Sequence, residues 1–174
     1  RFMSDVSAWL GLPVTVIRSE KFANTFEVYD DTGFMKNQWG AKCTTELKKK
    51  PRQKFQQAGD LQIFGFDINE RGRAQRFVEN NPEVWANFPL IDVGLDKATC
   101  RQMLVGAGVQ EPRTYGEGFQ NANCLNFGCV KGGIGYWNHI RKVRPHVFER
   151  MANKERELGY ALLKQMVDGV YTPV

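Results

Sequence analysis

Apolar positions follow two spacings along the chain, and each spacing predicts a different kind of element. A spacing of three or four residues is typical of helices. It predicts helices over 1–10, 22–30 and 44–57, after Asn69, after Asp96, and in a final pair divided near Pro145. Short β-branched or aromatic runs predict extended segments at 13–19, 61–67 and 88–94. Because strands alternate with helices, we expect an α/β fold, with a parallel sheet flanked by helices and a helical C-terminal region.

Two features of the C-terminal half extend this pattern. The last helix keeps apolar residues from Val147 to Met166 near one face, so we expect it to continue to about that point. The segment from Pro112 to Gly135 is rich in Gly and Asn and has little periodicity. It is too long for a simple connection, and long ordered loops are usually functional.

The size and composition are those of one globular domain. The 174 residues are enough for one core and too few for two ordinary ones, so we expect a single domain over 1–174. Hydrophobic residues make up 42% and charged residues 25% of the chain, and no apolar run approaches the length of a membrane span. No secretory signal is present at the start, so we expect a cytoplasmic protein with no membrane partner.

The charge balance is basic. The net charge is +5 at pH 7 and the pI is about 9.1, which favours an anionic ligand, either a nucleotide or a nucleic acid. Lysine and arginine are concentrated in two runs, 48–54 and 141–146. The alternative interpretation of each run is a solvated helix face.

Four cysteines are candidates for a shared site: Cys43, Cys100, Cys124 and Cys129. In a chain without an export signal the thiols are expected to stay reduced, which makes disulfides the less favoured use. Four thiolates bind one tetrahedral zinc ion or one iron–sulfur cluster. The alternative is that Cys100 is a small buried hydrophobe and the others are incidental thiols.

A second constellation combines a glycine near a strand end with the charges of the next helix. Gly65 lets a ligand approach the backbone, and Glu70, Arg73 and Arg76 crowd the helix start that follows. Arginine matches phosphate or sulfate oxygens, and ligands of α/β folds lie at the carboxyl ends of strands. The alternative is an exposed helix with charge pairs three residues apart.

Two shorter motifs complete the candidate chemistry. Cys43 lies beside a predicted helix start with Lys42 and Lys48 close by, and both features favour the thiolate that a metal needs; the alternative is an amphipathic helix with an ordinary cap. Glycines at 130–137 predict a close backbone approach, but the run is a poor match to a phosphate-binding loop. Two histidines, His139 and His146, have no recognisable catalytic partner, so we interpret both as surface or core residues.

Several of these segments together resemble the phage and bacterial branch of the phosphoadenosine phosphosulfate reductase family. The segments are RFMSDVSAWLGLPVTVI, GAKCTTELKKKPRQKF, GFDINERGRAQRF, FPLIDVGLDKATCRQML and the run from Asn121 to Gly159. They cover nearly the whole chain in the order that the family has. The resemblance implies the adenine-nucleotide α-hydrolase-like fold, which is also called the PP-loop pyrophosphatase fold.

The resemblance also assigns roles to residues. It implies that Cys43 sits in the family's cysteine-and-lysine motif, and that Glu70 and Arg73, with Arg76 as a further candidate, line a pocket for an adenine nucleotide or sulfonucleotide. Lys42 or Lys48 would then bind phosphate or sulfate. It further implies that the four cysteines converge on a [4Fe–4S] cluster, which it favours over zinc.

The chain departs from the family at both ends. The SGGKDS-like phosphate loop and its strand are absent, so we expect the fold to be incomplete at its N-terminus. The tail, VDGVYTPV, lacks the Glu-Cys-Gly motif of assimilatory reductases. A nucleophilic cysteine would have to be one of the four, which conflicts with all four being ligands.

Two functions follow as expectations. The first is a nucleotide-binding domain of sulfur metabolism, either an oxidoreductase that reduces a sulfonucleotide or a transferase that inserts sulfur, with a thiol or sulfur-donor protein as partner. The second is a metal-stabilised basic module that binds nucleic acid or a host factor and has lost catalysis. In the second, Trp39 and Trp137 would stack on bases, and Arg141 and Arg144 would contact phosphates.

Overall fold

The computed structural model describes residues 1–38, 40–122, 124–168 and 170–173; among these, the side chains of 165–167 and 170–173 lie outside the description. The fold is mixed α/β, with about half of the residues in helices and only small sheets. The chain forms two compact units: the first unit is Arg1–Thr15 with Gln56–Glu111, and the second unit is Val16–Phe55 with Pro112–Val174. A single domain over 1–174 stays a prediction.

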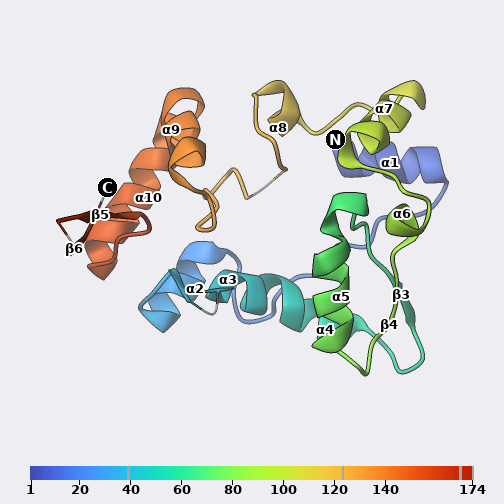
Figure 1. The fold of residues 1–174 in the computed structure, drawn as a ribbon, viewed down its shortest axis with the longest axis horizontal. Helices are drawn as coiled ribbons and strands as arrows, with labels where there is room; N and C mark the ends of the chain where they lie inside the picture. Colours follow the sequence, from blue (N-terminus) through green and yellow to red (C-terminus); the bar gives the residue numbers. More distant parts are fainter. Residues whose placement is uncertain (39, 123, 169, 174) are drawn as a thin grey trace. The chain divides into compact units, whose positions relative to one another are not determined.

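The first unit is built around two parallel strands. Its elements are helix α1 (Phe2–Leu10), strand β3 (Leu61–Ile63), the 3-10 turn η2 (Ile68–Glu70), helix α5 (Arg71–Glu79), strand β4 (Trp85–Asn87), and helices α6 (Pro89–Asp92) and α7 (Lys97–Gly106). β3 and β4 run side by side in parallel, with Leu61 opposite Trp85 (Figure 1). A parallel pair separated by a helix confirms the predicted α/β class at this level, and the nucleotide-hydrolase-like fold stays a prediction.

Side-chain caps explain where the helices of the first unit begin. The Asp96 side chain accepts a hydrogen bond from the Thr99 N–H at 2.7 Å, as predicted for the start of α7. The helical segment after β3 begins at Asp67 rather than Asn69, because Asp67 and Glu70 form a reciprocal capping box.

Two of the three predicted extended segments are wrong or displaced. Residues 13–19 contain no strand, since a β-branched run forms a strand only where another strand pairs with its backbone, and none of the described strands does so here. The third strand is 85–87, not 88–94. Pro89 lies at the first position of α6, where its fixed φ favours a helical turn.

The first unit buries little apolar surface. A cluster of four phenylalanines, with ring centroids 4.5 to 6.5 Å apart, packs beside the strands: Phe64, Phe66, Phe77 and Phe88. None of these side chains is fully buried. On one face of the strand pair, the exposed fractions of Leu61, Ile63 and Trp85 are 44%, 69% and 66%.

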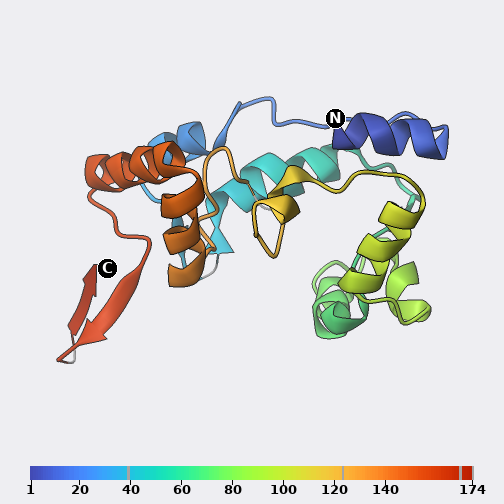
Figure 2. The same cartoon turned by 90° about the horizontal axis from the view of Figure 1, so that it is seen from above.

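The second unit is mostly helical. It contains α2 (Thr25–Thr32), the hairpin β1 (Lys36–Asn37) and β2 (Gly40–Ala41), and a helical stretch of α3 (Lys42–Thr44), the π-helical turn η1 (Thr45–Lys49) and α4 (Lys50–Phe55). After the first unit's chain segment come α8 (Arg113–Gly116), α9 (Ile134–Val143), α10 (Pro145–Leu158) and the hairpin β5 (Lys164–Val167) and β6 (Val170–Pro173). Figure 2 shows α9 followed directly by α10, as the division near Pro145 predicted.

The last helix ends earlier than its apolar pattern predicts. α10 stops at Leu158, because Gly159 takes a left-handed conformation with φ of 59° and caps the helix. Residues 164–167 form strand β5, so the prediction that the helix continues to Met166 is wrong.

A continuous core holds the second unit together. Side chains from α2, the hairpin segment after it, the loop before α9, α9, α10 and the segment after α10 form one buried cluster: Tyr29, Met35, Ala41, Phe119, Leu125, Val130, Trp137, Ile140, Val147, Met151 and Leu162. Gly128 lets the loop pass directly over an aromatic ring, since a Cβ at this position would lie 2.2 Å from Cη2 of Trp137. The loop between α8 and α9 is therefore packed onto the core.

None of the helices in the described ranges combines the length and the hydropathy that crossing a bilayer requires.

Candidate functional site

Three of the four cysteines gather in the second unit. Cys43 lies on α3, and Cys124 and Cys129 lie in the loop before α9. Burial raises the pKa of the Cys43 thiol most, and negative charge on Cys124 and Cys129 raises it further. Such charge effects act between close groups, so the three sulfurs are electrostatic neighbours although they come from distant parts of the sequence.

A buried tyrosine fixes the first of these thiols. The Tyr29 hydroxyl donates to Sγ of Cys43 at 3.8 Å, and the Tyr29 side chain is fully buried. Burial, with the neighbouring Cys43, raises the pKa of Tyr29 well above its ordinary value, so the phenol keeps its proton. The hydrogen bond lowers the pKa of Cys43 and partly offsets the burial that raises it.

A second tyrosine, Tyr136, contacts the backbone of Cys129. The backbone N–H of Cys129 donates to the Tyr136 hydroxyl at 3.0 Å. Burial raises the pKa of Tyr136 to about 12, and negative charge on Cys129 and Cys124 raises it too. Tyr136 therefore lies beside two of the thiols and remains protonated near neutral pH.

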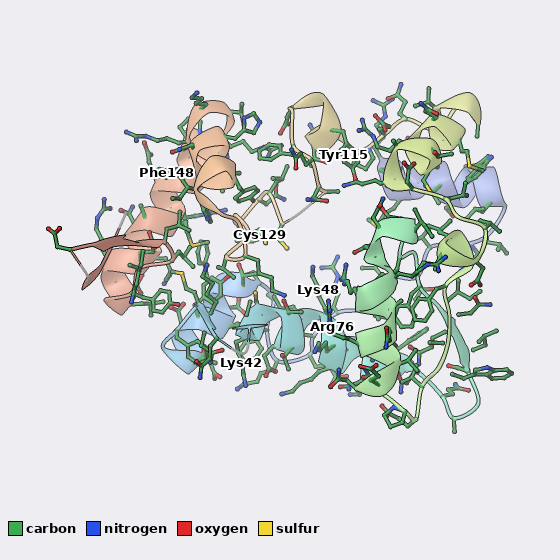
Figure 3. The ribbon with its side chains drawn as sticks, in the orientation of Figure 1. Lys42, Lys48, Arg76, Tyr115, Cys129 and Phe148 are labelled. Atoms are coloured by element: carbon green, nitrogen blue, oxygen red, sulfur yellow. The ribbon has the colours of Figure 1, made fainter. Side chains whose placement is uncertain are left out.

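The π-helical turn brings a lysine to the thiols. In an α-helix, residues five apart point about 140° away from each other, whereas the i→i+5 bonds of a π turn stack them on one side. Lys48 lies within η1, five residues after Cys43, which precedes the turn, and Lys48 lowers the pKa of Cys43. Figure 3 labels Lys48 on the side of this helix that faces Cys129.

Lys42 has a different partner. Its ammonium group lies 3.6 Å from a carboxylate oxygen of Glu46, and Lys50 pairs with the same carboxylate at 2.8 Å. Glu46 is 6% exposed, and the two lysines, Lys50 more than Lys42, keep its pKa below its usual value. Lys42 thus neutralises a buried acid, whereas Lys48 acts on the pKa of Cys43.

The thiols provide the donors for a soft metal, but the donors are not assembled around one. Thiolates suit zinc and iron–sulfur clusters. Within the residues whose structure is described, no group of three or more Cys, His, Asp or Glu side chains has the geometry to hold a metal ion. The remaining predicted ligand, Cys100, lies on α7 in the first unit.

The residues predicted for a nucleotide pocket are divided between the units. Lys42 and Lys48 belong to the second unit, and Gly65, Glu70 and Arg73 belong to the first. Arg73 forms an ion pair with Glu70 three residues before it, and its guanidinium lies 4.4 Å from the Phe66 ring centroid.

These contacts match the alternative interpretation of a helix with local charge pairs. Arg76 is exposed on the same helix, α5. Gly65 has open space where a Cβ would stand, so no close approach of other protein atoms requires glycine there.

A cavity of about 550 Å³ lies in the second unit beside the thiols. Its lining includes Tyr136 and His139 of α9, Lys131 and Gly133 of the glycine run before it, and Gly118 and Phe119 after α8. Tyr136 contacts both the cavity and Cys129. The glycine run at 130–137 signalled this approach, since a Cβ at Gly132 would lie 2.1 Å from Cδ1 of Tyr136.

The cavity wall is braced by an ion pair. Arg144 donates two hydrogen bonds to the Glu117 carboxylate, at 2.7 and 2.8 Å. His139 Nε2 lies 2.7 Å from the Glu117 carbonyl oxygen, so this nitrogen carries a proton and donates it. The sequence showed no partner for His139, because its hydrogen-bond partner is a backbone carbonyl, which every residue has.

The residues predicted to contact nucleic acid differ in their burial and in their partners. Trp39 lies outside the described residues. Trp137 is 5% exposed within the core, so its predicted role of stacking on a base is wrong. Arg144 is held by Glu117, and Arg141 lies over the Phe148 ring at 5.6 Å.

The chain matches no protein-family model, no curated protein and no solved structure.

Proposed function

We propose that this chain is a thiol-based domain of sulfur chemistry that acts on an adenine nucleotide or sulfonucleotide. In the proposal, Cys43, Cys124 and Cys129 bind a soft metal centre, a [4Fe–4S] cluster in preference to zinc, and Cys100 is the candidate fourth ligand. The reaction is reduction of a sulfonucleotide or transfer of sulfur to an activated acceptor. The basis for the reaction class is the resemblance of the motifs to phosphoadenosine phosphosulfate reductases.

The proposal rests on one observation, the convergence of three thiols and Lys48 in the second unit. Negative charge on Cys124 and Cys129 raises the pKa of Cys43, so thiolates gathered here cost stability unless a cation neutralises them. A bound metal would do this most fully, since a coordinating thiol is deprotonated outright. The same metal would draw the sulfurs together, and metal binding is often coupled to such closure.

Binding of a nucleotide by Arg73 requires a local rearrangement. Arg73 must leave the Glu70 carboxylate before its guanidinium can bind phosphate or sulfate. Exposed pairs of this kind contribute little stability, so a ligand with two or more negative charges can compete for Arg73. Lys48 is the corresponding cation on the thiol side.

The test is metal content after anaerobic purification of the full chain. We expect iron and acid-labile sulfide, with the broad visible absorbance of a cluster, and loss of both in Cys43→Ser and Cys129→Ser. A colourless protein with one equivalent of zinc that the same variants lose would assign zinc instead. Wild-type protein free of either metal, or variants that retain it fully, would refute the metal centre.

Cys100→Ser is the matched control. A variant that keeps the metal defines a centre of three protein ligands in the second unit, and one that loses it assigns Cys100 as the fourth. Nucleotide use is tested separately by thermal shift with adenosine nucleotides on wild type and Arg73→Ala. A shift that is equal in both proteins would remove Arg73 from the proposed pocket.

A further inference from the structure

The two units carry opposite charge. The second unit contains 18 Lys and Arg residues against 10 Asp and Glu residues, a difference of +8, and the first contains 6 against 9, a difference of −3. The net charge of +5 for the whole chain therefore understates how basic the second unit is. Strongly basic surfaces attract polyanions over long range.

Two exposed lysines of this unit lie on segments that line the cavity. Lys131 lines the cavity, and Lys142 follows His139 by three residues, which places it one turn further along the same face of α9. Both side chains are exposed, and neither forms an ion pair with a carboxylate in the described part of the chain.

The cavity itself suits an aromatic base. Its lining includes the partly exposed rings of Tyr136 and His139, and the buried ring of Phe119, whose centroid lies 4.5 Å from that of His139. Among its described lining residues there is no acidic side chain. The nearest carboxylate that we identify, that of Glu117, is neutralised by Arg144. A volume of about 550 Å³ lies within the range of sites that enclose a small organic ligand.

We propose that the second unit binds single-stranded nucleic acid, with one unstacked base in the cavity and neighbouring phosphates on Lys131 and Lys142. A single strand is favoured because only unpaired bases can leave the stack and enter a pocket. The pairing of a ring-lined cavity with flanking cations is the arrangement that such strands recognise. The proposal does not depend on the metal centre or on the sulfur chemistry proposed above.

The test is fluorescence anisotropy with labelled single-stranded RNA and DNA of about twelve nucleotides, titrated with the full chain at several salt concentrations. We expect binding to weaken as salt rises, because each phosphate contact releases counterions. Lys131→Glu and Lys142→Glu should each weaken binding and lower the salt slope by about one. A duplex of the same sequence should bind less well than the single strand.

Lys164→Glu is the matched control, since Lys164 is an exposed lysine of the same unit that lies on β5, outside the cavity lining. It makes the same change in net charge and should leave affinity nearly unchanged. Equal losses in Lys131→Glu and Lys164→Glu would show a general charge effect and overturn the assigned site. Circular dichroism melts of each variant check that the fold is retained.

Two further outcomes would overturn the proposal. One is the absence of oligonucleotide binding at low salt. The other is displacement of the oligonucleotide by AMP when AMP is present at the same concentration as the oligonucleotide. This result would make the cavity a mononucleotide site. Neither outcome affects the metal measurements, so the two proposals fail independently.

Discussion

The second unit encloses a continuous apolar cluster, whereas the first unit leaves most of its large apolar side chains accessible. In the second unit Ile140 is fully buried and Met151 is 1% exposed. In the first unit, the only hydrophobic residues among those described that are buried are Ala74, Val84 and Val109. The same chain therefore contains a part whose stability comes from packing and a part whose strand pair is held mainly by backbone bonds and a cluster of half-buried rings. Averages over the whole sequence conceal this division.

The largest expected effect comes from truncating the core of the second unit. Ile140→Ala should lower the free energy of unfolding of that unit by about 2–5 kcal/mol, since it leaves a cavity in a packed interior. Ile63→Ala in the first unit removes a side chain that is 69% exposed and should change stability by no more than about 0.5 kcal/mol. Urea unfolding followed by circular dichroism measures both.

Hydrogen exchange then assigns each loss to a unit. Ile140→Ala should reduce protection of α9 and α10 and spare the amides of α5 and α7. Equal losses for the two substitutions would contradict the difference in packing between the units.

A glycine pair gives the next largest effect. Gly128 and Gly94 have nearly the same positive φ, 75° and 72°. A Cβ at Gly128 would lie 2.2 Å from Trp137, while a Cβ at Gly94 would meet nothing within 4 Å. Gly128→Ala should therefore cost about 1–3 kcal/mol beyond the conformational cost that it shares with Gly94→Ala. Thermal melts of the two variants measure the difference, and identical melting temperatures would contradict the close packing over Trp137.

The smallest effect concerns an ion pair and depends on pH. Arg144 holds the pKa of Glu117 below its usual value. The pair therefore stabilises the fold above the unfolded-state pKa of about 4.3, and this contribution disappears as pH falls through the lower folded-state pKa. Glu117→Gln should lower the free energy of unfolding by about 1 kcal/mol at pH 7. It should have very little effect once the pH is below the folded-state pKa of Glu117.

The corresponding pair of the first unit is the control. Arg101 pairs with Glu111, and the pKa of Glu111 is also lowered, chiefly by its hydrogen bond with Arg101. The Arg101 side chain is 43% exposed, against 19% for Arg144, so Glu111→Gln should have the smaller effect. Denaturant unfolding at pH 7 and at a pH below the folded-state pKa of both carboxyls compares the two variants. A loss for Glu117→Gln that is independent of pH would refute the electrostatic origin.

Local signals in the sequence predicted the elements whose ends are set by nearby residues. Asp96 caps α7, and Pro145 divides the last two helices, because a cap or a proline acts on its own turn. The strand predicted at 13–19 failed because strand formation depends on a partner elsewhere in the chain. The helix predicted to reach Met166 failed because a left-handed glycine at 159 outweighed the apolar spacing that continues beyond it.

The candidate site was predictable in its residue types and not in its assembly. The sequence predicted four cysteines as ligands of one site. The common location of Cys43, Cys124 and Cys129 in the second unit depends on how distant parts of the chain fold together. The cavity escaped prediction since its walls are largely backbone and aromatic side chains. For Arg73, proximity to Glu70 in sequence already favoured the ion pair that the structure contains.

The π turn η1 (Thr45–Lys49) sets the direction of everything that follows it in the helix. If the same five residues were wound as a regular α-helix, α4 would be rotated by about 100° relative to Cys43. The basic residues of α4 would then point in a new direction without any of them being replaced. The alignment of lysine with sulfur in this protein is therefore fixed by the hydrogen-bond pattern of one helical turn as much as by the identity of its residues.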